Sequence, residues 1–557
     1  MPAAYSDRNG RHSNAIFRKR FCSISLHSVS RRSPAITPAG GGLKKKEHGR
    51  LLLRMTSTMT HPFARLTPSN AVISLIMVSS LVRVLFAASI GLGIDESYMV
   101  AGGREIQISY FDHPPIAWWL SWGAAHLAGS EAPIVVRLPF IVLFAFSTWV
   151  MFRLTSYLFS ERAGLWAAIA FNLSPVIGVT SASMVLPDGP LICSLLLGAY
   201  GLARGVFDQT GSTTRWWVLC GICAGVALLT KYSAALSLVG AGLFLITTPA
   251  GRRWLAKPQP YIAAAVALLL FLPVILWNAE HDWVSFSFQG GRATGTRFRP
   301  WKPLITLAGE ALFLLPWIWL LLFTQFVKAA RGGPKDERRW LLCCLAAGAI
   351  LLFALISAWS SQGVLFHWAT PGYLMLFPLV GVWLAQQEIV RASWLRGGLI
   401  ATLTVVLVGI SIVATEVNFQ WIASVGGGFK KITDHDSEAI DWWGLRSQLV
   451  ERGLLKQGNR FVGATNWHNA GKIDYALGGA VPVVCLGNDS RQYGLTHPVA
   501  AQLGLDAVIL DQHMTLESVQ EVYGSRFDSV EELPPLQVMH GGRVATKFNL
   551  FLAHRLH

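Results

Sequence analysis

Long apolar segments separated by short polar stretches run from residue 71 to residue 415. A helix that crosses a bilayer needs about 20 mostly apolar residues. By that measure the sequence predicts eleven membrane spans, at 71–93, 133–157, 163–182, 187–205, 214–230, 232–248, 261–278, 303–327, 340–358, 369–386 and 395–415. Tight connections join the pairs within 163–205 and 214–248, so the pattern defines the division inside each pair least sharply. The pattern as a whole predicts an all-α polytopic membrane bundle.

The pattern changes after residue 415. Short apolar runs now alternate with polar and charged residues, which is typical of strands and short helices in an extramembrane domain. We expect strands at 460–465, 481–486, 507–510 and 548–552 and a short helix at 468–478. Residues 416–557 are therefore predicted to form a small C-terminal α/β domain that follows a transmembrane domain at 71–415.

The composition agrees with a membrane protein. Of the 557 residues, 52% are hydrophobic and only 14% are charged, whereas soluble chains carry about 25% charged residues. These figures exclude a disordered, a collagen-like and an ordinary soluble protein. The net charge is +16, but residues 1–70 supply +11 of it, from 13 Lys and Arg against two Asp and Glu. Because the rest of the chain carries only +5, we expect no nucleic-acid partner.

Residues 1–70 are rich in Ser, Arg, Gly and Pro and have no apolar periodicity. Such a segment buries too little apolar surface to offset the entropy of ordering, so we interpret it as a disordered basic cytoplasmic tail. An arm that binds anionic lipid headgroups is the functional alternative. Met55 and Met59 stand shortly before the first predicted span, so an over-extended start is compatible with this segment as well.

The distribution of Lys and Arg predicts the topology. If the N-terminus lies in the cytoplasm and the spans alternate, most flanking positive charges fall on the cytoplasmic face, as the positive-inside rule requires. An odd number of spans then places residues 416–557 on the outer face, together with the 94–132 loop between the first two spans. Within that loop, residues 114–129 are predicted to form an amphipathic helix in the membrane interface.

Ionisable residues gather on the predicted outer face. Asp95 and Glu96 follow the first span, Asp112 and His113 precede two prolines, Asp188 opens the fourth span, and Lys231 stands between the fifth and sixth. Each is also compatible with a solvated loop charge or a helix cap. Lys231, however, lies in a short apolar hairpin, and ionisable groups at membrane depth are costly and usually functional. Arg83 and Glu310 lie inside predicted spans and belong to the same class.

The order of these motifs resembles a known family. Asp95-Glu96-Ser-Tyr98, Tyr110-Phe-Asp-His-Pro-Pro115, Pro187-Asp-Gly-Pro-Leu191 and Thr230-Lys231 follow one another as in the polyprenyl-phosphate-sugar-dependent glycosyltransferases of the C-type fold. The branches that the chain resembles are the protein O-mannosyltransferase-like, lipid A aminoarabinose transferase-like and rhizobial galacturonosyltransferase-like proteins. The resemblance covers about 71–415, and residues 466–475 and 489–493 look like the outer domain of some bacterial members.

The resemblance implies a multi-pass protein of the bacterial inner membrane, with the N-terminus in the cytoplasm and the C-terminal domain in the periplasm. It implies a sugar donor carried on a polyprenyl phosphate and a lipid, glycan or protein of the envelope as acceptor. By position, Asp95 matches the acidic residue at the reacting centre, Glu96 stands beside it, and Asp188 matches a second acid. Asp112 and His113 match an acid and base pair, in which some relatives have Lys at the position of His113.

The expected reaction needs a carboxylate and positive charge. An acceptor hydroxyl attacks the anomeric carbon while Asp95 orients it and accepts its proton, and a single displacement predicts inversion. Positive charge stabilises the departing phosphate, and the candidates are Lys231 first, then His113, Arg104, Arg137 and Arg292. A His can be neutral at pH 7, however. Further candidate cavity residues are Asp112, Tyr98, Glu310, His367 and Trp368. The segment 281–302 is either a mobile lid over the sugar or a plain connector.

No cofactor is implied with certainty. Asp95, Glu96, Asp112 and His113 offer ligand atoms that a divalent metal accepts, but they lack a dedicated metal-binding spacing, so a metal is not expected to be required. The alternative functions are a polytopic transporter or lipid flippase without transferase activity, and a non-catalytic assembly subunit. The two halves show no repeat of the kind that transporters tend to carry, and the acids lie at span ends, which favours the enzyme.

Overall fold

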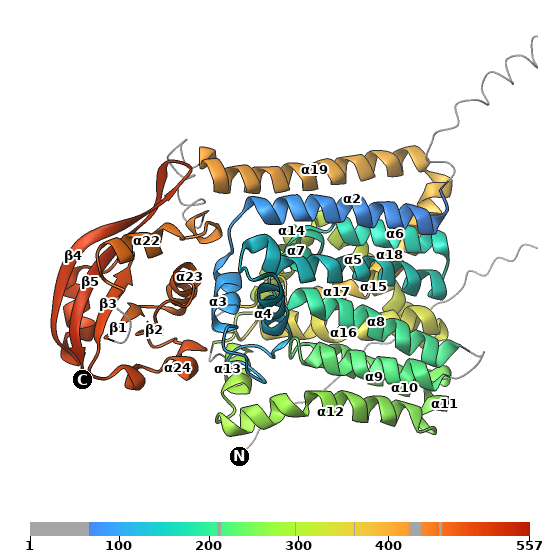
Figure 1. The fold of residues 1–557 in the computed structure, drawn as a ribbon. Helices are drawn as coiled ribbons and strands as arrows, with labels where there is room; N and C mark the ends of the chain where they lie inside the picture. Colours follow the sequence, from blue (N-terminus) through green and yellow to red (C-terminus); the bar gives the residue numbers. More distant parts are fainter. Residues whose placement is uncertain are drawn as a thin grey trace, which may run out of the picture. The chain divides into compact units, whose positions relative to one another are not determined.

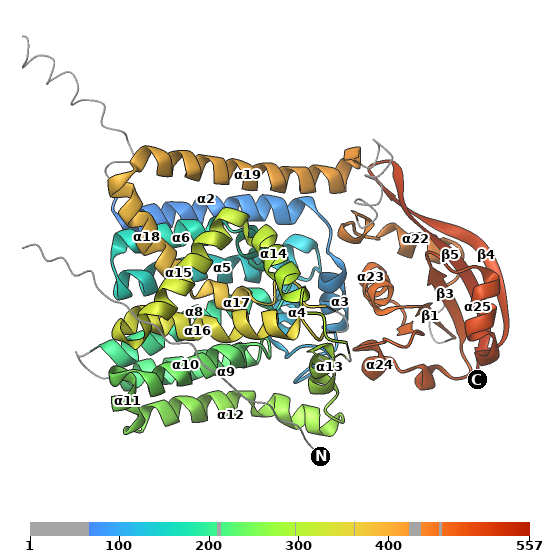
Figure 2. The same ribbon diagram turned by 180° about the vertical axis from the view of Figure 1, so that it is seen from behind.

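A bundle of helices followed by a mixed sheet makes up the described part of the chain, which comprises residues 66–208, 213–293, 295, 297–360, 363–422, 436–455 and 459–557 of a computed structural model (Figure 1). Residues from Leu66 to His557 form one compact unit. The long helices of the bundle are α2 (Pro68–Ser89), α5 (Pro133–Leu158), α8 (Asp188–Phe207), α12 (Gln259–Glu280), α16 (Glu337–Ile356) and α19 (Ala392–Phe419). Helices α2 and α19 run side by side along one edge of the bundle, as both ribbon views show (Figures 1 and 2).

These six helices are each long and apolar enough to cross a membrane. Three further candidate spans are bent pairs: α6 (Glu161–Leu173) with η2 and α7 (Val176–Ser183), α10 (Ala234–Thr247) with α11 (Pro249–Leu255), and α14 (Lys302–Leu314) with the stretch from Pro316 to Lys335, which begins with α15 (Pro316–Gly332). By length and composition the described residues contain six candidate spans, or up to nine if each bent pair counts as one, whereas the sequence predicts eleven. Helices α9 (Thr214–Leu228) and α18 (Phe377–Val390) fall on two of the predicted spans but have only 15 and 14 residues.

Proline stands at each of the three bends. The paired helices meet at 82°, 99° and 117°, and the second part of each pair begins at or just after Pro175, Pro249 or Pro316. Proline lacks a backbone N–H and its ring clashes with the preceding helical turn. The helix axis is therefore free to change direction at these points. The spans predicted at 163–182 and 303–327 run through two of these bends, whereas the span predicted at 232–248 ends just before Pro249.

The C-terminal sheet has five strands in the order β2-β1-β3-β5-β4. The strands are β1 (Arg460–Ala464), β2 (Val483–Cys485), β3 (Asp506–Asp511), β4 (Phe527–His540) and β5 (Arg543–Leu556). Strand β1 pairs in parallel with β2 and β3, whereas β5 pairs antiparallel with β3 and β4. Helix α23 (Trp467–Leu477) connects β1 to β2. The four predicted strands and the predicted helix are confirmed.

Strand β4 and the helices α22 (Gly444–Glu451), α24 (Tyr493–Thr496) and α25 (Leu516–Tyr523) are elements of this domain that the pattern did not predict. Strand β4 contains Pro534 and Pro535, and its pairing with β5 shifts register between Leu533 and Leu536. Proline is tolerated at edge strands and bulges because its missing N–H can face away from the ladder. β4 occupies the edge of the sheet, so the two prolines interrupt the sequence pattern without ending the strand.

The sheet domain packs directly against the 94–132 loop of the bundle. This loop contains α3 (Ile94–Gly102) and α4 (Ile116–Ala128), and α23 lies against α3. A Cβ atom at Gly471 of α23 would stand 2.9 Å from Cα of Tyr98, so the two helices approach as closely as glycine allows. The predicted helix at 114–129 is confirmed as α4, while its position in a membrane interface stays a prediction.

Candidate active site

A cavity of about 720 Å³ lies between the bundle and the sheet domain. Its wall is built by α3, the loop before α4, the start of α8, the α9–α10 turn, α13 (Val284–Ala293) and residues 365–368, together with α23 and Arg491 of the sheet domain. The charged and aromatic residues in this wall include Asp95, Glu96, Asp112, His113, Arg137, Asp188, Lys231, Arg292, His367, Trp368, Trp467, His468 and Arg491. Segments far apart in the sequence therefore meet at one site.

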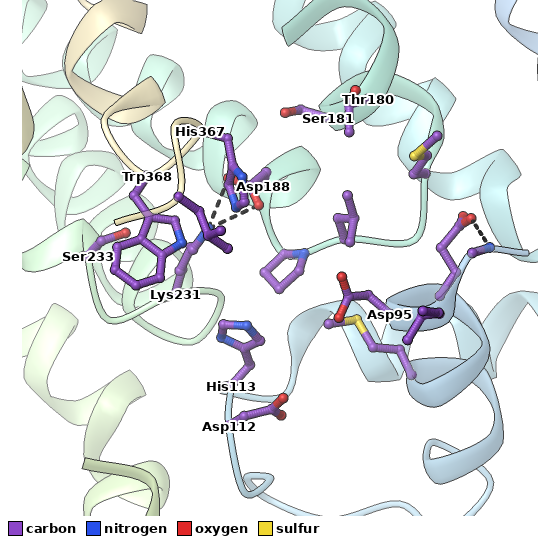
Figure 3. A pocket seen from close by; sticks show the side chains of 18 of the residues that line it. Asp95, Asp112, His113, Thr180, Ser181, Asp188, Lys231, Ser233, His367 and Trp368 are labelled. Atoms are coloured by element: carbon purple, nitrogen blue, oxygen red, sulfur yellow. Dashed lines mark hydrogen bonds and ion pairs between the residues drawn. The ribbon is translucent and has the colours of Figure 1, made fainter. Parts of the chain in front are cut away.

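Asp95 stands in the first turn of α3 with its carboxylate in the cavity (Figure 3). The side chain is open to the cavity rather than packed, and no described residue donates a hydrogen bond to it. Enclosure by the surrounding protein raises the pKa of Asp95, an effect that the positive charges of Arg491 and His468 oppose. An unpaired carboxylate with a raised pKa has the properties of a general base.

The carboxylate of Glu96, the next residue, is buried and fully hydrogen-bonded, unlike that of Asp95. Its carboxylate is 2% exposed and accepts hydrogen bonds from Arg137 Nε at 2.8 Å and Nη2 at 2.6 Å, and from the backbone N–H groups of Gly93 and Val185. Burial opposes ionisation of Glu96, but the charge and hydrogen bonds of Arg137 outweigh it and hold the pKa below its usual value. Arg137 also donates to the carbonyl groups of Ala87, Ile90 and Gly91. The pair therefore fixes the end of α2 to α3 and α5.

Asp188 and Lys231 form the second charged pair of the cavity. Asp188 is the first residue of α8, and Lys231 lies in the turn between α9 and α10. Lys231 Nζ stands 3.1 Å from both carboxylate oxygens of Asp188. His367 and Trp368 flank this pair, with Lys231 beside the Trp368 ring (Figure 3). Burial and the nearby Lys231 charge lower the pKa of His367 to about 4, so the imidazole is neutral at pH 7.

Asp112 and His113 lie between Asp95 and the Asp188–Lys231 pair (Figure 3). Asp112 is 4% exposed; its Oδ2 atom stands 3.3 Å from Arg491 Nη1, and its Oδ1 atom has no partner. Burial raises the pKa of Asp112 to about 6. Burial and Lys231 lower the pKa of His113 to about 3, and its Nδ1 atom is buried without a partner. His113 lines the cavity as a neutral side chain and has no fixed positive charge to offer a phosphate.

Arg292 and Arg491 bring further positive charge. Arg292, on α13, stacks over Trp368 at 4.5 Å and over Phe288 at 5.6 Å from the ring centres. Arg491 lies 3.5 Å from the centre of the Trp467 ring and 5.3 Å from that of Phe288. Helix α13 is held in place by Gln289, which donates to the backbone carbonyl of Asp112 at 2.6 Å. The segment 281–302 thus contributes a cavity wall; its role as a moving lid stays a prediction.

Three of the predicted site residues lie outside the cavity wall. Arg104 binds Glu131 through two hydrogen bonds of 2.8 and 2.7 Å and Asp474 through one of 2.7 Å, which ties the 94–132 loop to α23. Tyr98 is buried at the α3–α23 contact, where its hydroxyl accepts from the backbone N–H of Gln492. Glu310 is fully buried and accepts a hydrogen bond from Tyr373 at 2.6 Å. Arg83, inside α2, binds Asn172 and the carbonyl of Gly178 instead of reaching a membrane surface.

The sheet domain supplies cavity residues that the sequence did not single out. Trp467, His468 and Arg491 fall inside the two segments that resemble the outer domain of some bacterial transferases, at 466–475 and 489–493. That resemblance was the available signal, because the pattern of an α/β domain says nothing about which loop faces the membrane bundle. Gln289 carried no signal of its own.

Lys472 of α23 positions the turn that leads into α3. Its Nζ atom is buried and donates to the carbonyls of Leu92, Glu438 and Ile440 at 2.7, 3.0 and 2.6 Å. The backbone N–H of Leu92 in turn donates to Asp441 at 3.0 Å. Two polar contacts from the sheet domain therefore hold the backbone three residues before Asp95. Burial lowers the pKa of Lys472 to about 8.

The described residues form no group of three His, Cys, Asp or Glu side chains with metal-binding geometry. Asp95, Asp112 and His113 all line the cavity, but they do not share a partner. Asp112 lies against Arg491, whereas the side chains of Asp95 and His113 make no hydrogen bond with the described residues. The geometry therefore adds no ligand set for the divalent metal that the sequence left open.

Comparison with known proteins shows which family and which fold this chain resembles. Residues 112–277 match the family described as dolichyl-phosphate-mannose-protein mannosyltransferase. The lipid A galacturonosyltransferase RgtD of Rhizobium johnstonii is 23% identical over 299 residues, which is 52% of this chain and 60% of the relative. The lipopolysaccharide core galacturonosyltransferase RgtB of the same organism is 21% identical over 311 residues, 54% of this chain and 61% of the relative. The matches thus span about three fifths of the length of these curated relatives.

The crystal structure of ArnT from Cupriavidus metallidurans bound to undecaprenyl phosphate superimposes with a TM-score of 0.59 at 15% identity, over 86% of this chain and 97% of ArnT. The apo form of ArnT gives a TM-score of 0.57 over the same shares. The resemblance to the C-type glycosyltransferases is confirmed, and the fold is ArnT-like.

Proposed function

We propose that this chain transfers a sugar from a polyprenyl-phosphate donor to an acceptor of the cell envelope. Its membrane domain, which has the fold of the C-type glycosyltransferases, supports this proposal. One observation carries the proposal. One cavity contains an unpaired carboxylate, Asp95, and cationic groups at Lys231 and Arg292. A lipid-phosphate sugar needs this combination, because one group must activate a hydroxyl while others stabilise a departing phosphate.

Two of the comparisons support the choice of substrates. The ArnT structure carries undecaprenyl phosphate, and the two curated relatives act on lipid A and on the lipopolysaccharide core. We therefore propose an undecaprenyl-type carrier as donor lipid and an envelope glycolipid as acceptor, with a glycan or a protein as the remaining acceptor classes. By the positive-inside argument the cavity faces the periplasm and residues 1–70 lie in the cytoplasm.

The reaction follows from the positions of the charged groups. The acceptor hydroxyl enters between the sugar and Asp95, which orients it and accepts its proton as the new bond to the anomeric carbon forms. The bond from that carbon to the phosphate oxygen breaks on the opposite face, and the electron pair leaves with the phosphate. Lys231 and Arg292 stabilise the developing negative charge, which counts for more in an enclosed cavity than in water. A single displacement of this kind inverts the anomeric centre.

Asp188 has a supporting part in this scheme. It holds Lys231 Nζ at 3.1 Å by both oxygens, so the ammonium group stays in the cavity before the donor arrives. A phosphate that approaches Lys231 from the cavity side completes the hydrogen bonds of the ammonium group, which has three donors. Asp188 is therefore a positioning residue for the phosphate-binding Lys231.

The proposal is tested with purified protein, radiolabelled polyprenyl-phosphate sugars and an envelope extract as the source of acceptors. We expect wild-type protein to transfer label to glycolipid and Asp95→Asn to transfer it about 10²- to 10⁴-fold more slowly, the usual contribution of a general base. Asp528→Asn is the matched control, because Asp528 is a surface residue paired with Arg555. Movement of the lipid across liposomes without transfer to any acceptor identifies a flippase and overturns the proposal.

A further inference from the structure

Four arginines near the junction of the two domains differ in how many of their five N–H donors are used. Arg104 binds Glu131 and Asp474, and Arg137 binds Glu96 and three backbone carbonyls. Arg491 makes one hydrogen bond, of 3.3 Å, and the guanidinium of Arg292 makes none with described residues. The first two have structural partners, whereas the last two present unused donors to the cavity.

Arg491 is held firmly although it makes only one hydrogen bond, to Asp112, and one further ion pair, with Asp489. Its guanidinium lies 3.5 Å from the centre of the Trp467 ring, close enough for stacking, and its Nε atom is buried without a hydrogen-bond partner. Asp489 lies 3.6 Å from Nε, beyond hydrogen-bond length. The backbone of Arg491 has φ of 45°, a left-handed conformation that is uncommon for a residue with a side chain. Such strain persists where the surrounding structure maintains it, and it is frequent at ligand sites.

The cavity has two cationic ends. At one end, Lys231 projects from the α9–α10 turn of the membrane bundle beside Asp188 and His367 (Figure 3). At the other end, Arg491 comes from the sheet domain, beside Trp467 and His468. The carboxylate of Asp95 interacts electrostatically with Arg491 and His468, whereas the imidazole of His367 interacts electrostatically with Lys231 and Asp188. Arg292 lies between the ends and shares the Phe288 ring with Arg491.

A donor with its lipid in the bilayer brings its phosphate to the Lys231 end, because that end belongs to the membrane helices. The sugar then extends toward Asp95 and the sheet domain. Arg491 lines the cavity at this end, and its Nη2 atom makes no hydrogen bond with the described residues. A planar guanidinium binds a carboxylate through charge-assisted hydrogen bonds.

We propose that Arg491 binds a carboxylate on the transferred sugar, so that the donor is a polyprenyl-phosphate uronic acid and Arg491 determines this specificity. The inference rests on the proposed function, since it names the substrate class of the same cavity. The curated relatives are galacturonosyltransferases, and a galacturonosyl group carries a carboxylate at C6. The relatives do not indicate which residue binds the carboxylate. The position of Arg491 in the cavity wall points to this residue.

The test compares two donors that differ only at C6. Polyprenyl-phosphate galacturonic acid and polyprenyl-phosphate galactose share the lipid, the phosphate and the ring configuration, and only the first has a carboxylate. Binding of each donor and kcat/KM for transfer to envelope extract are measured for wild type, Arg491→Gln, Arg491→Lys and Arg460→Gln. Arg460 is the matched control, because it belongs to the same domain and pairs with Asp506 on β3.

We expect Arg491→Gln to lower kcat/KM for the uronic acid donor by roughly 10- to 100-fold, the range for a lost hydrogen bond to a charged group. It should leave the galactose donor within about twofold, which also shows that the variant is folded. Arg491→Lys should recover only part of the loss, since an ammonium group lacks the planar fork. Arg460→Gln should match wild type with both donors.

Three results overturn the inference. Equal losses for both donors in Arg491→Gln place Arg491 on the phosphate, and a raised acceptor KM with unchanged donor binding places it on an anionic acceptor. Equal use of the two donors by wild type shows that no carboxylate is read. A wild-type protein that transfers another polyprenyl-phosphate sugar but neither of these two also overturns the inference and leaves the proposed function intact.

Discussion

Asp95 and Glu96 are adjacent carboxylates with opposite roles, and the substitution Glu96→Gln separates them. Glu96 has four hydrogen bonds within 2.9 Å and a buried ionic partner, Arg137, which is 1% exposed. Asp95 has no hydrogen-bond partner among the described residues and lines the cavity. We therefore expect Glu96→Gln to act on stability and Asp95→Asn to act on the rate of transfer.

The size of the stability effect follows from the buried charge that Glu96→Gln leaves behind. Breaking a buried ion pair by removing one partner typically costs about 3–5 kcal/mol, because the remaining charge has no counterion. Arg137 keeps three backbone carbonyls as acceptors, which places the expected loss toward the lower end, about 3 kcal/mol. For a unit of this size the entropy of unfolding corresponds to roughly 1 kcal/mol per degree, so Tm should fall by about 3 °C.

Thermal unfolding of the purified protein in one detergent, followed by intrinsic tryptophan fluorescence, measures this shift. Asp95→Asn serves as the control, since it replaces a side chain of the same α3 turn that has no partner to lose. In the double variant Glu96→Gln, Arg137→Met no unpaired charge remains, so its Tm should lie above that of Glu96→Gln alone. An unchanged Tm for Glu96→Gln, together with a loss of transfer equal to that of Asp95→Asn, would show that Glu96 takes part in the chemistry and would refute this assignment.

Three further predictions concern residues that act around Asp95. Lys472→Met leaves three buried carbonyls without a donor, so kcat should fall about 10-fold through displacement of Asp95, and Lys472→Arg should restore it. An unchanged kcat in Lys472→Met would show that Lys472 does not position Asp95. Asp112 is neutral below its pKa of about 6 and then no longer competes for Arg491, so the KM of an acidic donor should be lower at pH 5 than at pH 7.5 in wild type. In Asp112→Asn the KM should be low at both pH 5 and pH 7.5. The same pH dependence of KM in wild type and in Asp112→Asn contradicts this explanation. Lys231→Gln should weaken binding of polyprenyl phosphate without sugar by at least about 10-fold, whereas equal binding by the variant removes Lys231 from the phosphate site.

The sequence predicted the class of fold and most of the charged residues in the cavity wall. Asp95, Asp188 and Lys231 were identifiable because charged side chains are rare in apolar helices and stand at helix ends, where hydropathy changes. The bend at Pro316 was not identifiable, since the flanking residues are apolar on both sides of the break and the span predicted at 303–327 runs through it. Helices α9 and α18 fall on two of the predicted spans but have only 15 and 14 residues, fewer than the about 20 that a span usually needs.

The partners of the arginines could not be predicted from the pattern. The ion pair between Asp112 and Arg491 joins residues 379 positions apart, and the hydrogen bonds between Arg104 and Asp474 join residues 370 positions apart. Only the packing of α23 on α3 decides which of these arginines has its donors filled. Arg104 and Arg137 were equal in the sequence to Arg292 as phosphate ligands, and the structure separates them by their neighbours.

This separation by neighbours also explains why the sheet domain belongs to the active site. A guanidinium with donors that make no hydrogen bond is unfavourable when it is buried, so Arg491, whose side chain is 16% exposed, is tolerated beside the cavity and would be costly elsewhere in the packed domain. Its aromatic support, Trp467, lies at the first turn of α23, and Lys472 on the same helix holds the backbone before Asp95. Movement of α23 would therefore displace both the sugar-facing arginine and the base together. If Arg491 and Asp95 have the roles that we propose, one helix couples recognition of the sugar to activation of the acceptor, and a substitution that loosens α23 should lower both donor affinity and turnover.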